Sequence, residues 1–88
     1  MKITSVSVIG GGAWGTALAQ AAAMAGRSVT MVARDRAVIE EINQHSRNRA
    51  YLGDIRLSER IVALDHVPLS ADLVVLAVPA QASRSALT

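Results

Sequence analysis

The sequence contains no cysteine and no phenylalanine, and its only aromatic residues are one tryptophan and one tyrosine. Without cysteine, a disulfide framework, a thiolate metal site and a cysteine nucleophile are all excluded, and a reducing cytoplasm is the compartment we expect. With so few aromatic side chains there is almost no platform on which single-stranded nucleic acid could stack. Nucleic acid is therefore not an expected partner.

Long uninterrupted apolar runs are also missing. A helix that spans a membrane needs about 20 consecutive apolar residues, and no run in this sequence is that long. A secretory signal peptide is disfavoured, because the glycines at 10–12 and Gln20 interrupt the apolar segment that such a peptide requires. We expect no membrane span and no cleaved leader.

The composition that is present is typical of a globular protein. Of the 88 residues, 51% are hydrophobic and 18% are charged, and the net charge is +2. Disordered chains have too little apolar content to offset chain entropy, so disorder is not expected. A chain of this length can bury only about two thirds of its unfolded surface. Its core is therefore small, and its stability in isolation is expected to be marginal.

Strands and helices alternate in the apolar pattern. We expect strands at 3–9, 28–33 and 61–64, where β-branched residues are frequent, and at 72–78, a nearly continuous apolar run typical of a strand buried on both faces. Helices are expected over 13–25, ending at Gly26, after the N-cap residue Asp35, and over 80–88. Residues 46–58 lack a sustained period and predict an irregular polar connection.

This order of elements predicts an α/β fold, a Rossmann-type parallel sheet with flanking helices. A complete dinucleotide-binding domain uses two such halves. Residues 1–88 are therefore expected to form the amino-terminal part of a dinucleotide-binding domain, with the carboxy-terminal substrate domain absent from this chain.

The segment from Gly10 to Gly15, Gly-Gly-Gly-Ala-Trp-Gly, fits the pattern G-x-G-x-x-G. It follows an expected strand and opens an expected helix, where main-chain N–H groups and the helix dipole can bind a pyrophosphate. We expect Gly10 to permit the tight turn, Gly12 to admit the phosphates and Gly15 to let the helix pack near the strand. A turn without a ligand is the alternative.

The residues after the second expected strand bear on which nucleotide is bound. An acidic residue about 20 positions beyond the motif favours NAD, and an arginine there accommodates the 2′-phosphate of NADP. Arg34 can lie against the adenine or contact a phosphate, whereas Ala33 cannot bind a hydroxyl. Asp35 could reach the ribose, but we favour helix capping as its role. NADPH and NADH both stay candidates.

The run from Gly12 to Ala19, Gly-Ala-Trp-Gly-Thr-Ala-Leu-Ala, resembles the amino-terminal segment of NAD(P)-dependent glycerol-3-phosphate dehydrogenases. The resemblance continues at 32–35, 51–52 and 78–81. It implies that Ala13 and Trp14 lie in the cofactor-binding turn, with Tyr51 nearby, although a tryptophan at a helix start is often simply packed. The cofactor-binding residues that we expect are Gly10, Gly12, Ala13, Trp14, Gly15, Arg34 and Pro79.

Two positions depart from the family pattern. The family commonly has serine where this chain has Ala13, and proline where it has Gly53. The first change removes a hydroxyl near the phosphates, and the second alters the loop after Tyr51. The family's lysines for substrate and proton transfer lie beyond residue 88, so we expect no catalytic residue in this chain.

The resemblance implies an oxidoreductase as the parent protein. Such an enzyme interconverts dihydroxyacetone phosphate and sn-glycerol 3-phosphate by hydride transfer with NADH or NADPH, and supplies glycerol phosphate for phospholipid synthesis in the cytoplasm. Its partners would be the dinucleotide and the phosphorylated three-carbon substrate, and a homodimer is compatible with it. The alternatives are a Rossmann dehydrogenase of different substrate and a non-catalytic dinucleotide-sensing module.

The remaining polar residues favour no second site. His45 and His66 have no ligand partner at metal-binding spacing, so no metal is expected. His66 follows Asp65, but adjacent side chains usually point apart, which favours an ordinary loop histidine. Glu40 and Glu41 are expected to face water. Four arginines could form a basic patch for a phosphate, although solvated loop arginines are commoner: Arg47, Arg49, Arg56 and Arg60.

Overall fold

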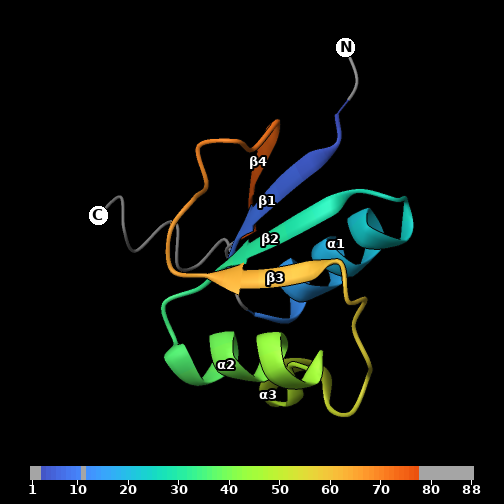
Figure 1. Ribbon diagram of the computed structural model, residues 1–88. Helices are drawn as coiled ribbons and strands as arrows, with labels where there is room; N and C mark the ends of the chain where they lie inside the picture. The colour runs from blue at the N-terminus through green and yellow to red at the C-terminus, as the bar shows by residue number, and fades with distance from the viewer. Residues whose placement is uncertain (1–2, 11, 78–88) are drawn as a thin grey trace.

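The computed structural model describes residues 3–10 and 12–77. A four-stranded sheet forms its centre, in the order β3-β2-β1-β4, and every neighbouring pair of strands is parallel. Figure 1 shows the strands as a fan, with the helices gathered beside β2 and β3. The elements are β1 (Ser5–Ile9), α1 (Ala13–Met24), β2 (Ser28–Val32), α2 (Arg36–His45), α3 (Arg49–Leu52), β3 (Ile61–Leu64) and β4 (Leu73–Leu76). The parallel Rossmann-type sheet predicted from the sequence is confirmed.

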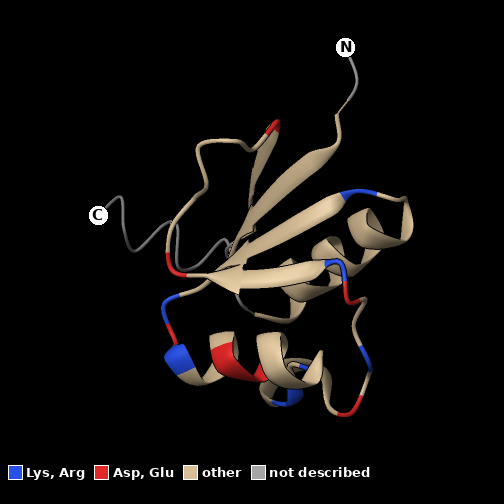
Figure 2. Ribbon diagram, in the orientation of Figure 1, with Lys and Arg blue, Asp and Glu red and all other residues tan. Residues whose placement is uncertain are grey.

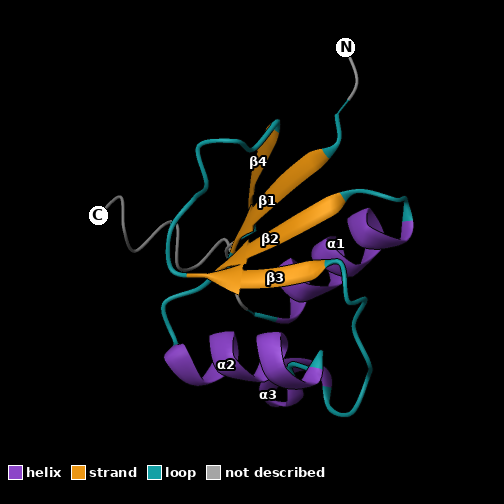
Figure 3. Ribbon diagram, viewed as in Figure 1, coloured by secondary structure: helices purple, strands orange, loops and turns teal. Residues whose placement is uncertain are grey.

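The core lies between the sheet and the helices (Figure 3). Val8 of β1 is in register with Met31 of β2 and Val75 of β4, and Met31 is in register with Ala63 of β3. Val8 is 1% exposed, and Met31 and Ala63 are 0% exposed. On the helix side, Ile42 of α2 is 1% exposed. Alternate strand residues thus form one buried face, as the two-residue period of a strand requires.

Helix α1 is rich in alanine, a good helix former with a small side chain. Ala19 and Ala23 are 0% and 3% exposed, so α1 packs closely on the sheet. After Met24 the chain turns at Gly26, whose φ of +87° lies in the left-handed region that favours glycine. The predicted helix ending at Gly26 is confirmed.

Helix α2 begins where the sequence predicted. Asp35 is its N-cap residue, and the Asp35 Oδ1 atom accepts a hydrogen bond from the Ala37 N–H group at 2.9 Å. This bond satisfies one of the N–H groups that lack a partner at a helix start. Val38 and Ile42 are the buried residues of α2.

Two predicted elements differ from the structure. Helix α3 lies inside the segment 46–58 that was predicted to be irregular, because a helix of 4 residues is too short to show a period. The predicted burial of the fourth strand on both faces is wrong for the described residues. Leu73 is 42% exposed, Val74 47% and Leu76 67%, since β4 pairs only with β1 and is the outer strand of the described sheet. Val78 and the predicted helix 80–88 lie outside the described residues.

Within the described ranges, no helix is long and apolar enough to cross a membrane.

Candidate functional site

The carboxyl ends of the parallel strands meet at one edge of the sheet, and this edge carries a cavity of about 430 Å³. In open parallel sheets, ligands bind at this edge, where the strand order reverses. The reversal falls here at β1, which has β2 on one side and β4 on the other. Gly10 follows β1, Arg34 follows β2, Asp65 follows β3 and Leu76 ends β4, and all four line the cavity.

Gly10 and Gly15 are required by the chain itself. Gly10 has a φ of +127°, and a Cβ atom there would overlap the carbonyl oxygen of Ala77. A Cβ atom on Gly15 would overlap the carbonyl oxygen of Gly10. These two glycines therefore allow the tight turn after β1 and the close packing of α1 against that turn.

Gly12 has no such internal requirement. Its φ of −80° and ψ of −172° are open to any residue, and the nearest atom to an added Cβ would be Cε1 of Tyr51 at 4.0 Å. Gly12 lines a second cavity, of about 200 Å³, together with Arg34 and Tyr51. Among the described residues nothing prevents a larger side chain at Gly12. The glycine instead leaves the main chain open to whatever occupies that cavity.

The start of α1 presents main-chain N–H groups at the same place. The first bond of the helix runs from the Thr16 N–H to the Gly12 carbonyl oxygen at 2.9 Å. The N–H groups of Ala13, Trp14 and Gly15 precede this bond and so have no partner within the helix. Gly12 provides no side-chain cap, and the first turn holds no acidic residue. The partial positive charge of the helix start is therefore available to an anion.

Arg34 and Asp35 have different roles, although they are adjacent. The exposed Arg34 lines both cavities, and no carboxylate within the described residues pairs with it. Asp35 caps α2 through Ala37, so the predicted capping role is confirmed. The cation at the end of β2 is thus the group with free bonding capacity.

Two of the other predicted cofactor contacts lie at the start of α1. Ala13 is exposed, and Trp14 is 67% exposed at the start of α1. Trp14 is therefore not packed in the core, which was the alternative to ligand contact. Pro79 lies outside the described residues.

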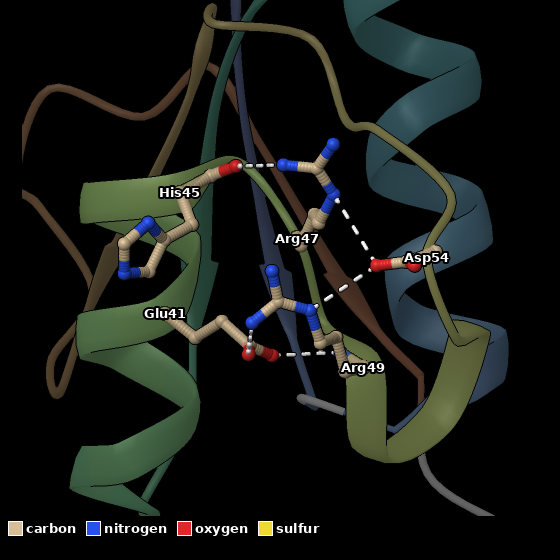
Figure 4. Close-up of polar contacts among 5 residues, drawn as sticks. All are labelled: Glu41, His45, Arg47, Arg49 and Asp54. Atoms are coloured by element: carbon tan, nitrogen blue, oxygen red, sulfur yellow. Dashed lines mark hydrogen bonds and ion pairs between the residues drawn. The ribbon is translucent and has the colours of Figure 1, made fainter.

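The short helix α3, which contains Tyr51, is tied to α2 through Arg49 and Glu41 (Figure 4). The Arg49 N–H donates to Glu41 Oε1 at 2.6 Å, and the Arg49 guanidinium lies 3.2 Å from Glu41 Oε2. The same guanidinium contacts Asp54 Oδ1 at 3.2 Å, and Arg47 approaches that oxygen at 3.6 Å. Glu41 was expected to face water, but it instead anchors α3. The sequence offered no indication of this contact, because it joins residues on two helices.

Each of the four arginines for which a basic patch was the less favoured interpretation has a partner within the chain. Arg47 and Arg49 share Asp54, Arg56 pairs with Glu59 at 3.2 Å, and Arg60 donates to the carbonyl oxygen of Gly26 at 3.4 Å. Figure 2 shows basic and acidic positions interspersed along α2, α3 and the following loop. The basic side chains are therefore matched by nearby acceptors instead of forming a patch of one charge.

Asp65 and His66 contact each other at the end of β3. The Asp65 Oδ1 and His66 Nδ1 atoms are 2.8 Å apart, so the expectation that these neighbours point apart is wrong. The chain bends after the strand, which brings the two side chains together. The hydrogen bond from His66 lowers the pKa of Asp65 below its usual value. Across the described residues, no group of three potential metal ligands gathers.

Sequence reasoning did not single out Asp65 as a residue of this edge. Its position directly after β3 was a usable indication, because the carboxyl ends of parallel strands lie together. Asn48 was also missed, although its side chain and main chain join the glycine turn to α3. Nothing in the local sequence predicted that contact across 32 residues.

The fold and this edge define the chain as a Rossmann-type α/β unit of the nucleotide-binding class. Residues 5–88 match the family described as the NAD-dependent glycerol-3-phosphate dehydrogenase N-terminus. The chain belongs to this family.

Individual relatives agree with that assignment. The chain is 46% identical over 88 residues to the glycerol-3-phosphate dehydrogenase [NAD(P)+] of Brucella ovis, covering 97% of this chain and 27% of the relative. The protein of the same name from a Parafrankia strain is 46% identical over 84 residues, covering 92% of this chain and 25% of the relative.

Solved structures show the same arrangement. The glycerol-3-phosphate dehydrogenase of Plasmodium falciparum superposes with a TM-score of 0.77 at 29% identity, covering 97% of this chain and 27% of that one. DsGPDH of Dunaliella salina gives a TM-score of 0.70 at 29% identity, covering 92% of this chain and 17% of that one. The chain thus spans about a quarter of the length of the curated relatives it matches.

Proposed function

We propose that this chain is the amino-terminal, dinucleotide-binding part of an NAD(P)-dependent glycerol-3-phosphate dehydrogenase. The observation that carries the proposal is the open space around Gly12. Among the described residues nothing requires a glycine there, yet the residue stands between bare main-chain donors and an open cavity. Room for a phosphate to approach the main chain explains that choice.

Different described residues would bind different parts of the cofactor. The turn from Gly10 to Gly15, with Ala13 and Trp14 at the helix start, would hold the pyrophosphate through main-chain N–H groups. Arg34 would hold the adenosine end, and its free guanidinium suits the 2′-phosphate of NADPH. Tyr51 would border the same cavity. Pro79 stays a proposed contact on the basis of the family resemblance alone.

The bound nicotinamide supplies the hydride chemistry, and this chain binds and orients the cofactor. The proposed parent enzyme interconverts dihydroxyacetone phosphate and sn-glycerol 3-phosphate, and its product would enter phospholipid synthesis. We expect this chain alone to bind the cofactor without turnover, because the catalytic lysines that the resemblance implies lie beyond residue 88. A cytoplasmic location fits the absence of cysteine.

The proposal is tested by titrating the chain with NADPH and with NADH and following cofactor fluorescence. The wild-type chain should bind at least one of them. Gly12→Ala should keep the thermal unfolding midpoint of the wild type, because an added Cβ meets only Tyr51 at 4.0 Å. The same change should weaken binding about 30-fold or more, because the methyl group occupies the approach of the phosphate, a loss of about 2 kcal/mol.

Ala21→Val is the control for an enlarged side chain on α1, since Ala21 is exposed and lies two turns beyond the glycine segment. It should leave the Kd unchanged. A Gly12→Ala chain that binds dinucleotide as tightly as the wild type would contradict the proposal. Turnover of dihydroxyacetone phosphate by this chain alone would show that the catalytic groups have been misplaced.

A further inference from the structure

We infer that Asn48 and Thr16 are positioning residues of the glycine turn, which orient its main chain for the dinucleotide and couple it to the turn that carries Tyr51. The inference rests on the proposed function, because it concerns how the same site is held ready. It assigns a role to two polar residues that touch neither cavity.

Both side chains are completely buried. Thr16, on the first turns of α1, and Asn48, at the N-cap of α3, are each 0% exposed. The Asn48 Nδ2 atom lies 2.8 Å from Thr16 Oγ1, and Thr16 Oγ1 lies 2.7 Å from the carbonyl oxygen of Gly12. Buried polar groups normally have such partners, and the loss of one partner costs far more than the loss of an exposed bond.

The direction of these hydrogen bonds follows from the groups involved. The Gly12 carbonyl oxygen can only accept, so the single proton of the Thr16 hydroxyl is donated to it. The hydroxyl then accepts from the next group, which places the N–H₂ side of the Asn48 amide against Thr16. The bonds therefore run in one direction, from Asn48 through Thr16 to Gly12.

This chain of bonds fixes a peptide group at the site. The Gly12 carbonyl accepts both the Thr16 N–H at 2.9 Å and the Thr16 hydroxyl at 2.7 Å, so it is held pointing into the helix. The Ala13 N–H belongs to the same planar trans peptide and points the opposite way. Holding the carbonyl inward thus holds this N–H outward, toward the place where an anion would bind.

The main chain of Asn48 forms the other half of the link. Its carbonyl oxygen accepts from the Leu52 N–H at 2.8 Å and the Tyr51 N–H at 3.2 Å. The same residue therefore binds the glycine turn through its side chain and the Tyr51 turn through its backbone. Gly12 and Tyr51 both line the cavity of about 200 Å³, and Asn48 connects the two segments that carry them.

The experiment is a double-mutant cycle on the chain with Thr16→Val, Asn48→Ala and the double variant, read as the Kd for NADPH. Each single change should raise the Kd about tenfold, and the double change should raise it little further, because both break the same link. Thr16→Ser, which keeps the hydroxyl, should bind within about twofold of the wild type. A folded Thr16→Val or Asn48→Ala chain with the wild-type Kd overturns the inference.

Asn43→Ala is the matched control. Asn43 is another side-chain amide with backbone partners, accepting from the Ala63 N–H at 2.7 Å and donating to the Ala63 carbonyl at 2.9 Å, but it lies at the outer edge of β3. Its loss should lower stability and leave the Kd unchanged. An equal loss of affinity in Asn43→Ala would mean that the effect reflects stability alone, which overturns the inference.

Amide hydrogen exchange of the wild-type chain tests the coupling of the two turns without requiring that any variant folds. Saturation with NADPH should slow exchange of the Leu52 amide, which donates to Asn48, as well as that of Ala13. Unchanged exchange at Leu52 on binding overturns the coupling. If the wild-type chain binds neither NADPH nor NADH, the proposed function fails, whereas binding with unaffected variants overturns this inference alone.

Discussion

The polar groups at the two ends of the parallel sheet differ in whether they are hydrogen-bonded within the chain. At the amino end, the Asp72 Oδ2 atom accepts from the Thr4 N–H at 3.0 Å, the Thr4 hydroxyl at 3.0 Å and the Ser5 N–H at 3.1 Å. At the carboxyl end, Arg34 lines cavities of about 430 and 200 Å³, and Gly12 at the start of α1 lines the smaller one. The polar groups of the amino end are bonded to one another, whereas those of the carboxyl end are available to a ligand.

This difference separates residues that hold the fold from residues that serve binding. The contacts of Asp72 hold the start of the outer strand β4 against the start of β1. The open end carries the costs of an uncapped helix start and an unpaired cation, which a bound anion would offset. Changes at the closed end should therefore alter stability, and changes at the open end should alter affinity.

The largest expected effect is an exception to this division, because it is a change in stability at a glycine of the open end. Gly15→Ala should destabilise the chain by about 2–3 kcal/mol, because the new Cβ overlaps the carbonyl oxygen of Gly10 in a packed turn. For a small fold of marginal stability this is enough to unfold much of the population. Urea denaturation followed by circular dichroism measures it. A Gly15→Ala chain as stable as the wild type would show that the turn is not packed as described.

The next effect sharpens the assignment of the open end. Arg34→Ala should weaken NADPH binding about 30-fold, equivalent to about 2 kcal/mol for a charge-assisted bond, and weaken NADH binding only a few-fold. Calorimetric titration with both cofactors measures the difference. Arg56→Ala removes an exposed arginine that pairs with Glu59 and should change neither affinity. Equal losses for NADPH and NADH in Arg34→Ala would remove the case for a 2′-phosphate contact.

The smallest effect concerns the closed end and its response to acid. The backbone hydrogen bonds from Thr4 and Ser5 lower the pKa of Asp72 below its unfolded value. The stabilisation by these bonds is complete above about pH 4, the usual Asp pKa, and is lost as the pH falls from there through the lowered folded pKa. Asp72→Asn should reduce stability at neutral pH and flatten its decline in acid, with no change in NADPH affinity.

Thermal unfolding midpoints of Asp72→Asn and the wild type between about pH 2 and pH 7 measure this effect. The two curves should converge at the acid end. Parallel curves over the whole range would show that Asp72 does not contribute through its charge.

Local pattern was sufficient for most of the fold. The strand Ile61–Leu64 and the cap at Asp35 occur at the predicted residues, and α1 ends before Gly26 as expected. Each depends on neighbours a few residues away, such as a β-branched run, a capping side chain or a residue free to adopt positive φ. The order of these elements was in turn enough to predict a parallel sheet.

Contacts between distant residues were outside the reach of that reasoning. Glu41 anchors Arg49, and Asn48 binds Thr16. A periodicity argument predicts that such residues face solvent or have no specific contact, because their partners are defined only after the helices have packed.

The glycine pattern, the alternation of strands and helices, and the family of this chain were determined by the sequence itself, since all depend on residue types at short, fixed spacings. The tertiary structure alone identified the atoms that leave no room for a Cβ, the carbonyl oxygen of Ala77 at Gly10 and that of Gly10 at Gly15. It also decided that Tyr51 and Arg34 border one cavity. The physical reason is that close approach between segments, and the space left between them, is set by packing in three dimensions and has no counterpart in linear spacing.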